Sequence, residues 1–289
     1  MTGKRIRFTT LDAILLAALT AAALWFVHRV NADLQYRWQW PVLLQYLIRM
    51  DDGHWVIGTL TRGFLTTVKL SLWATLLATV LGTGIGLARI GRVRMARLAA
   101  LAYVELIRNL PPLVLVFIVY FFIGERVTTL LGLEQFVREA GPVAQRVTVW
   151  LFAPPSRLAG FLAGLATLVL YEAAYIAEIV RSGIESIEPG QWEAAHALGL
   201  TRAQQLRFVI LPQAFTRVLP PLAGQWISTI KDSAIVSVIS IPELTFQGLE
   251  LMSATYLTFE VWITITALYF SLTFLCSLGV RRLETCWQR

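Results

Sequence analysis

Long apolar runs alternate with short polar segments along almost the whole chain. Because a helix rises about 1.5 Å per residue and the hydrocarbon layer is ~30 Å thick, apolar runs near 20 residues predict membrane-spanning helices. We predict six spans, the fifth of them interrupted: residues 11–27, 64–88, 111–123, 160–179, 218–241 and 259–280. The pattern therefore indicates an all-α, polytopic helical membrane protein.

The segments between the spans differ in character. The first apolar run follows three basic residues and could be a cleaved signal peptide, but it ends in large aromatic residues, which favours an uncleaved span. Residues 31–56 are rich in Trp and Tyr, which prefer the membrane–water boundary. We expect residues 124–157 to be irregular and residues 242–257 to form a connector.

Composition and charge placement support a membrane protein and suggest its orientation. The chain has 289 residues, 56% of them hydrophobic and only 15% charged, which is too apolar for an ordinary soluble domain. With the N-terminus inside, inner segments hold 15 Lys and Arg residues and outer segments hold 8. Since basic residues favour the cytoplasmic side, we expect both termini in the cytoplasm.

The polar segment between the fourth and fifth spans has the signals of two short helices. Pro189 suits the first turn of a helix, and Gly199 suits a left-handed cap at its end. Thr201 and Gln204 form a potential capping box that opens a second helix. Pro212 is expected to limit that helix, because proline lacks a backbone donor and crowds the preceding turn.

Several motifs resemble those of one membrane-protein family, in the same order along the chain. The motifs are Y-V-E-L-I-R-N-L-P-P (103–112), Y-I-A-E-I-V-R (175–181), E-A-A (193–195) with Gly199 and V-I-L-P (209–212), and K-D-S (231–233). They resemble the polar amino acid branch of ABC-transporter permeases, whose cytoplasmic EAA loop docks on an ATPase. The resemblance covers residue 58 to the C-terminus. It departs at Val209, where isoleucine is usual, and at Ala234-Ile235, where serine and leucine are usual.

The resemblance implies a transport subunit rather than an enzyme, in a bacterial inner membrane. Its expected partners are two ATPase subunits, a second identical or paralogous permease, an extracytoplasmic solute-binding protein and an amino acid. This chain should bind no cofactor, and ATP and magnesium should act in the ATPase. Residues 1–57 would form an N-terminal helix and connector, and residues 58–289 a five-helix permease core with its coupling loop at about 183–214. The expected coupling residues are Glu193, Ala194, Ala195, Gly199, Leu211 and Pro212.

Other interpretations of the polar segment are less consistent with its residues. A DNA-binding helix-turn-helix would need net positive charge, whereas the arginines here are balanced by glutamates, so we expect no nucleic-acid partner. We expect Ala194, Ala195 and Leu198 to share one helix face suited to a partner. The glycines Gly82 and Gly86 lie within an apolar span and indicate helix packing rather than a nucleotide loop.

Ionisable residues at membrane depth are candidates for a substrate pathway, because charge there usually lines a cavity or has a partner. The candidates are Lys69, Arg108, Glu172, Lys231, Asp232 and Ser233. Lys231 could attract a carboxylate and Asp232 an ammonium, as an amino acid requires, although a structural role remains open. Lys69 could instead extend to the outer surface, and Arg108 fits a positioning role better than ligand contact. Glu178 and Arg181 are expected to form an ion pair.

Two rival functions share part of this pattern. An ABC importer for another solute, such as a metal chelate or a phosphonate, would have the same docking loop, but the motifs at 103–112 and 171–193 favour amino acids. An ATP-independent secondary transporter would also be polytopic. It would need no docking loop and would normally show internal repeats, which we do not detect.

Overall fold

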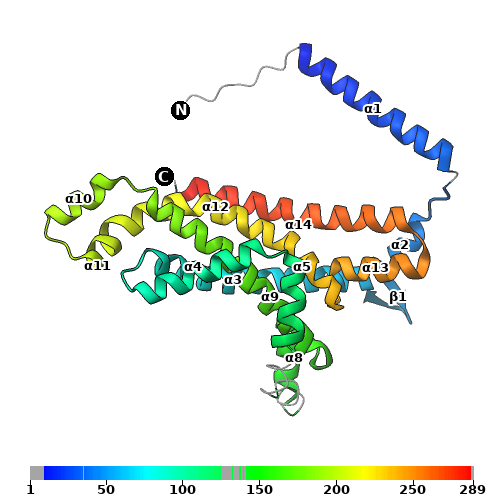
Figure 1. Ribbon diagram of the computed structural model, residues 1–289. Helices are drawn as coiled ribbons and strands as arrows, with labels where there is room; N and C mark the ends of the chain where they lie inside the picture. Colours follow the sequence, from blue (N-terminus) through cyan, green and yellow to red (C-terminus); the bar gives the residue numbers. More distant parts are fainter. Residues whose placement is uncertain are drawn as a thin grey trace. The chain divides into compact units, whose positions relative to one another are not determined.

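The computed structural model describes residues 10–34, 36–124, 132, 137, 139 and 141–287, and these are mostly helical (Figure 1). The chain separates into two units, Met1–Trp40 and Pro41–Arg289. The first unit holds α1 (Thr10–Leu34), whose described side chains are all exposed. The proposed division after residue 57 remains a prediction.

The second unit contains a short N-terminal segment and the packed helices. The N-terminal segment consists of α2 (Trp40–Leu47), which begins at the boundary between the units, and an antiparallel pair, β1 (Ile48–Asp51) and β2 (His54–Ile57). The remaining elements are α3 (Thr59–Ile90), α4 (Arg94–Asn109), α5 (Pro112–Ile118), the π-helix η1 (Val119–Gly124), α8 (Pro142–Leu151), α9 (Pro155–Glu185), α10 (Pro189–Ala197), α11 (Arg202–Gln204), the π-helix η2 (Gln205–Ile210), α12 (Leu211–Asp232), the 3-10 helix η3 (Ser233–Ile239), α13 (Leu244–Thr255) and α14 (Thr258–Trp287).

The helices include three that are long and apolar enough to cross a membrane, among the described residues: Thr59–Ile90, Pro142–Glu185 and Thr258–Arg282. Two bent pairs raise the number to five. Arg94–Asn109 and Pro112–Phe122 meet at 113°, and Arg202–Ile239 and Leu244–Thr255 meet at 50°. With α1, whose apolar part is shorter, this is compatible with the six predicted spans.

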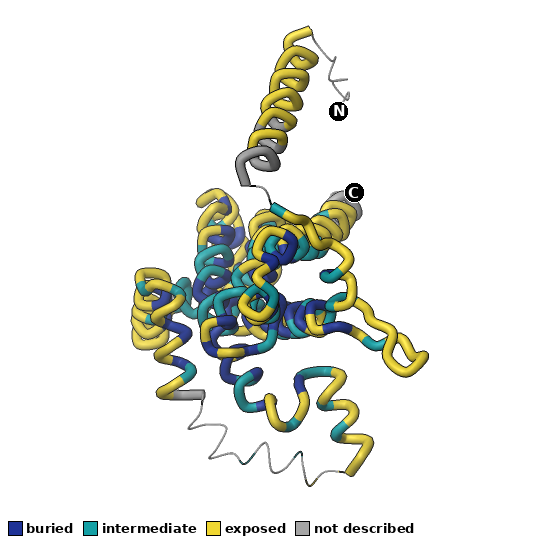
Figure 2. The backbone as a smooth tube through the Cα atoms, turned by 90° about the vertical axis from the view of Figure 1, so that its right-hand side faces the viewer, coloured by how far each residue is buried: buried dark blue, intermediate teal, exposed yellow. Residues whose placement is uncertain are grey.

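Close packing of α3 on α9 forms the centre of the second unit, and buried residues gather where the long helices meet (Figure 2). A Cβ atom on Gly82 would lie 2.7 Å from the Ala173 carbonyl oxygen, and one on Gly86 would lie 2.8 Å from that of Ala177. Only glycine allows this approach, so the predicted helix-packing role of both glycines is confirmed.

The structure differs from the expected pattern in the segments between spans. The expected connector at 242–257 is largely helix α13, and the segment at 124–157 contains helix α8. Part of the latter segment lies outside the described residues. The fifth span is interrupted as predicted, because α12 ends at Asp232 and the chain continues as a tighter 3-10 helix.

Candidate functional site

The polar segment folds as a helical hairpin, which we call the coupling hairpin (residues 186–214). Pro189 begins α10, and Gly199 has a φ of 75° at its end. The Leu200 amide donates to the Ala195 carbonyl (3.3 Å), and the Gly199 amide donates to that of His196 (2.9 Å). This is a Schellman cap, which requires the left-handed residue that glycine supplies. The predicted first helix and its glycine cap are confirmed.

The second arm of the hairpin begins at the predicted capping box. The Gln204 amide donates to the Thr201 hydroxyl (3.4 Å), while the Thr201 amide donates to the Gln204 side chain (2.8 Å). The expectation that Pro212 limits this helix is wrong. The chain widens into η2, where the Leu211 amide bonds to the Leu206 carbonyl, and then continues as α12. A π turn just before a proline accommodates the missing amide donor.

Side-chain amides and an arginine hold the hairpin together and to the spans. Gln205 is buried, and its amide donates to the Leu200 carbonyl (2.7 Å) at the turn. Arg217 donates to the carbonyl of Ser186 just beyond α9 (2.6 Å). A third link joins the two arms, from the Gln213 amide to the Gln191 side chain (3.1 Å). These hydrogen bonds connect α10 to α12, and α12 to the end of α9.

The six expected coupling residues do not all face outward. Glu193, Ala194, Gly199 and Pro212 are exposed, and Leu211 is half-buried. Ala195 is buried, so the prediction that it shares a face with Ala194 and Leu198 is wrong: successive helix residues point about 100° apart, as 3.6 residues per turn require. Leu198 is 78% exposed at the tip. The outer face combines an acidic residue, small residues and one apolar side chain.

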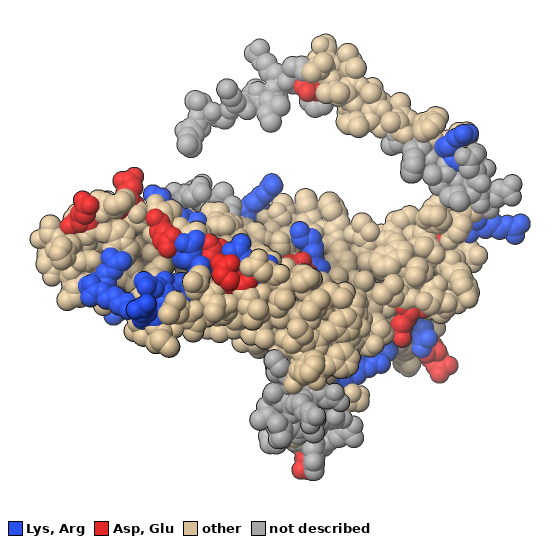
Figure 3. Space-filling view, in the orientation of Figure 1, with Lys and Arg blue, Asp and Glu red and all other residues tan. Residues whose placement is uncertain are grey.

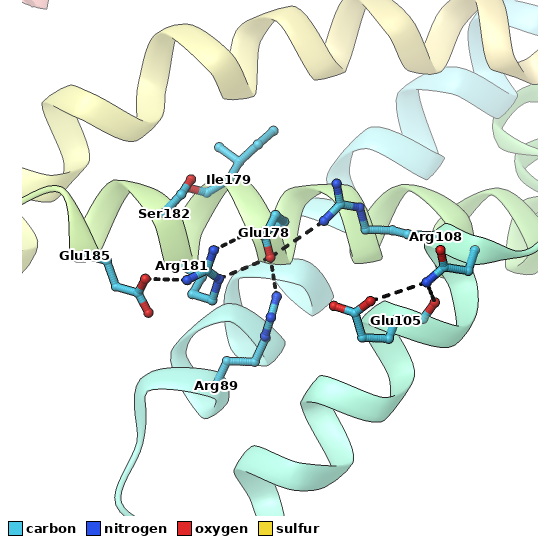
Figure 4. A network of polar contacts seen from close by, with 9 residues as sticks. Arg89, Glu105, Arg108, Glu178, Ile179, Arg181, Ser182 and Glu185 are labelled. Carbon is cyan, nitrogen blue, oxygen red and sulfur yellow. Dashed lines mark hydrogen bonds and ion pairs between the residues drawn. The ribbon is translucent and has the colours of Figure 1, made fainter.

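Near the end of α9, before the hairpin begins, three arginines surround one glutamate (Figure 4). Arg89 of α3 and Arg181 of α9 both form ion pairs with Glu178, which confirms the predicted Glu178–Arg181 pair. Arg108 of α4 lies 3.8 Å from the same carboxylate, and its guanidinium lies 5.5 Å from the centre of the Tyr175 ring. This cluster joins α3, α4 and α9 near the C-terminal end of each helix. Arg108 therefore contacts side chains of α9, as expected for a residue that positions helices.

A second polar cluster joins α9 and α12, within the predicted fourth and fifth spans. Glu172 is fully buried, and one of its carboxylate oxygens accepts from Gln225 (2.7 Å). Its other oxygen, Oε1, has no hydrogen-bond partner within the described part of the chain. The half-buried carboxyl of Asp232 lies beside it. Two neighbouring carboxyls with an unused oxygen suit a cationic group.

The remaining pathway candidates have other surroundings. The Lys69 ammonium donates to the Val149 carbonyl at the end of α8 (2.8 Å), so it caps that helix. Ser233 is buried and donates to the Ile230 carbonyl (2.7 Å). Lys231 is exposed beside Asp232. The structure therefore brings Glu172 and Asp232 together but gives Lys69 and Arg108 separate partners.

Glu243 is a buried acid that the sequence analysis did not single out. Glu243 is fully buried at the start of α13 and accepts from the Phe246 amide (2.7 Å), the Tyr269 hydroxyl (2.8 Å) and the Thr67 hydroxyl (3.3 Å). It ties α3, α13 and α14 together. A carboxylate directly before an apolar run was the available signal, since such a residue can cap a helix.

Comparison with known proteins gives consistent matches. Residues 78–285 match the family described as "Binding-protein-dependent transport system inner membrane component". The glutamine transport system permease protein GlnP of Escherichia coli is 35% identical over 220 residues, covering 75% of this chain and 89% of that protein. The glutamate/aspartate import permease protein GltJ of E. coli is 31% identical over 232 residues, covering 80% and 87%.

Solved structures show the same fold. An amino acid ABC transporter crystallised with histidines has a TM-score of 0.66 and 32% identity, covering 86% of this chain and 99% of that chain. An inward-facing MetNI methionine ABC transporter has a TM-score of 0.58 at 20% identity, covering 80% and 97%, and so shows the fold alone.

Proposed function

This chain belongs to the family of binding-protein-dependent transport system inner membrane components, and we propose that its coupling hairpin is the part that a separate ATPase moves. The chain is a permease subunit of an ABC importer for amino acids, a transport component rather than an enzyme. Its family works in the inner membrane with ATPase and solute-binding partners.

The construction of the hairpin is the observation that carries the proposal. Its turn is fixed by the Schellman cap and by buried Gln205, and its base is bonded to both neighbouring spans. The exposed face carries Glu193, Ala194 and Leu198. Small residues permit close approach of another helix or groove. A hairpin that is held rigidly and has an exposed face for a partner can transmit force without unfolding.

The proposed mechanism is alternating access driven by paired hairpins. Two permease subunits, identical or paralogous, enclose one pathway, and two ATPase subunits hold one hairpin each. ATP-driven closure of the ATPases, which use ATP and magnesium, draws the hairpins together and rocks the spans from inward-open to outward-open. The binding protein then releases its amino acid, and hydrolysis restores the inward-open state. This is a rigid-body transition between two packed arrangements.

We propose that Glu172 and Asp232 border the pathway and attract the substrate ammonium, while Lys231 can attract its carboxylate. The support is the unused Glu172 oxygen and the neighbouring Asp232 carboxyl. Ser233, Lys69 and Arg108 would shape the surrounding helices, because each is bonded to another part of the chain. In this arrangement both termini and the hairpin face the cytoplasm, as the arginine distribution favours.

The test is a matched pair of Ala-to-Arg substitutions. Ala194→Arg places a long charged side chain on the exposed face of α10, and Ala254→Arg places it on an exposed position of α13. We expect Ala194→Arg to remain membrane-inserted but to lose ATPase co-purification and ATP-driven amino-acid uptake in proteoliposomes. Ala254→Arg should retain the ATPase. Equal retention of the ATPase by both variants would show that α10 is not the docking element.

A further inference from the structure

Exposed arginines from two segments lie at one end of the second unit, and we call them the inner basic patch: Arg92, Arg94, Arg97, Arg202 and Arg207. Three come from the start of α4 and the short link before it, and two come from the second arm of the coupling hairpin. Figure 3 shows Lys and Arg side chains gathered over the region of α11 and α4. The patch thus joins two segments that are far apart in sequence.

The patch has positive charges without matching acids. Among the described residues, no ion pair to a carboxylate involves any of these five arginines. The Arg202 guanidinium lies 3.5 Å from the centre of the Trp192 ring, which fixes its position. Burial and the nearby charge of Arg92 lower the pKa of Arg202. Two like charges held together in this way are stabilised by an anion from outside the chain.

An exposed apolar stripe continues from the patch along α4. Met95, Leu98, Ala102 and Leu106 follow one another at three- and four-residue spacing, so they lie on one side of the helix. Met95 is 75% exposed and Leu106 is 61% exposed. The opposite side, with Val104 and Ile107, is buried. A helix with a bare apolar stripe that begins in arginines suits the boundary between acyl chains and headgroups.

We propose that the inner basic patch binds the phosphate headgroups of anionic phospholipids in the inner leaflet. The phosphates would neutralise the start of α4 and the Arg202 side of the coupling hairpin, while the acyl chains cover the stripe on α4. A phospholipid supplies both the charge and the apolar surface, whereas an acidic protein surface would leave the stripe uncovered. The assignment to the inner leaflet rests on the orientation given under the proposed function. The preference for anionic headgroups does not depend on that orientation.

The test uses Arg92→Gln/Arg94→Gln/Arg97→Gln, which leaves the coupling hairpin unchanged. Its control is Arg62→Gln/Arg157→Gln, which removes exposed arginines near the opposite ends of α3 and α9. The assembled permease–ATPase complex is placed in nanodiscs of phosphatidylcholine with increasing phosphatidylglycerol, and retained lipids are counted by native mass spectrometry. Each basic residue near an anionic surface strengthens binding about fivefold, so the triple variant should bind phosphatidylglycerol on the order of 100-fold more weakly.

Wild type and the control should retain phosphatidylglycerol in preference to phosphatidylcholine, and free glycerol phosphate should not displace it. Unchanged lipid selectivity in the triple variant would overturn the proposal. Displacement by glycerol phosphate would indicate a site for a small anion, and loss of the ATPase from the triple variant would indicate a protein-docking surface; either would also overturn it. If Ala194→Arg loses the ATPase, its lipid retention should still equal that of wild type. A failure of the proposed docking function is therefore distinguishable from a failure of the proposed lipid site.

Discussion

Three alanine substitutions within one helix turn and a half test the packing of α3 on α9. Gly82 and Gly86 face α9, whereas a Cβ atom on Gly84 meets no atom within 4 Å. Replacing glycine by alanine inside a helix stabilises the folded state by about 0.5–1 kcal/mol, because the unfolded chain loses less backbone entropy on folding. Gly84→Ala should therefore be neutral or stabilising by up to about 1 kcal/mol.

The same substitution at Gly82 has a steric cost. Its new Cβ atom would lie 2.7 Å from both the Ala173 carbonyl oxygen and the Ile176 Cβ atom. A backbone oxygen cannot rotate away, so α3 and α9 must separate. Overpacking of this kind costs about 1–3 kcal/mol, which exceeds the helix gain. Gly82→Ala should be less stable than Gly84→Ala by about 1–3 kcal/mol.

Thermal unfolding in detergent, followed by tryptophan fluorescence, measures this difference. At about 2–4 °C per kcal/mol, Gly82→Ala should melt several degrees below Gly84→Ala. The Gly82→Ala/Gly86→Ala double variant should lose less than the sum of the single losses, because one helix displacement relieves both contacts. Equal melting temperatures for Gly82→Ala and Gly84→Ala would refute the close helix approach.

Three further substitutions test other parts of the structure by thermal unfolding. Gly199→Ala should cost about 1–2 kcal/mol because φ is 75°, and Gly199→Asn should cost less, since asparagine tolerates the left-handed region; equal losses would contradict this. Glu178→Gln should cost about 1–3 kcal/mol by leaving the nearly buried Arg89 without its counter-charge, and adding Arg89→Gln should recover part of the loss. Tyr269→Phe removes one donor to Glu243 and should cost about 1 kcal/mol, whereas Glu243→Ala leaves three donors unpaired and should cost more; the reverse order would exclude the proposed network.

Features set by local sequence were predictable, and features set by distant contacts were not. The glycine cap at Gly199 and the capping box at Thr201 depend on a few neighbouring residues, and both are confirmed. The passage of the helix through Pro212 depends on a π turn that has no simple sequence signal. The inward position of Ala195 depends on packing inside the hairpin.

The polar clusters show the same limit. Glu178 and Arg181 are one helix turn apart, so their pairing follows from spacing. Arg89 reaches the same carboxylate from α3, and nothing in the sequence relates positions 89 and 178. Glu172 and Asp232 were separate candidates at membrane depth, and only the packing of α9 on α12 brings them together. The family motifs located the coupling hairpin in the sequence, but its hydrogen bonds to α9 and α12 are seen only in the fold.

The distance between the two hairpins in the assembled transporter tests the central claim most directly. Spin labels at Glu188→Cys, an exposed position at the start of α10, and at the matching position of the second permease subunit report this distance once Cys276 and Cys286 are replaced by alanine. Pulsed electron paramagnetic resonance of the complex in nanodiscs should show the labels moving closer when ATP is trapped and apart after hydrolysis. A distance that is the same with and without trapped ATP would contradict the account, because the ATPase would then not be moving the hairpins.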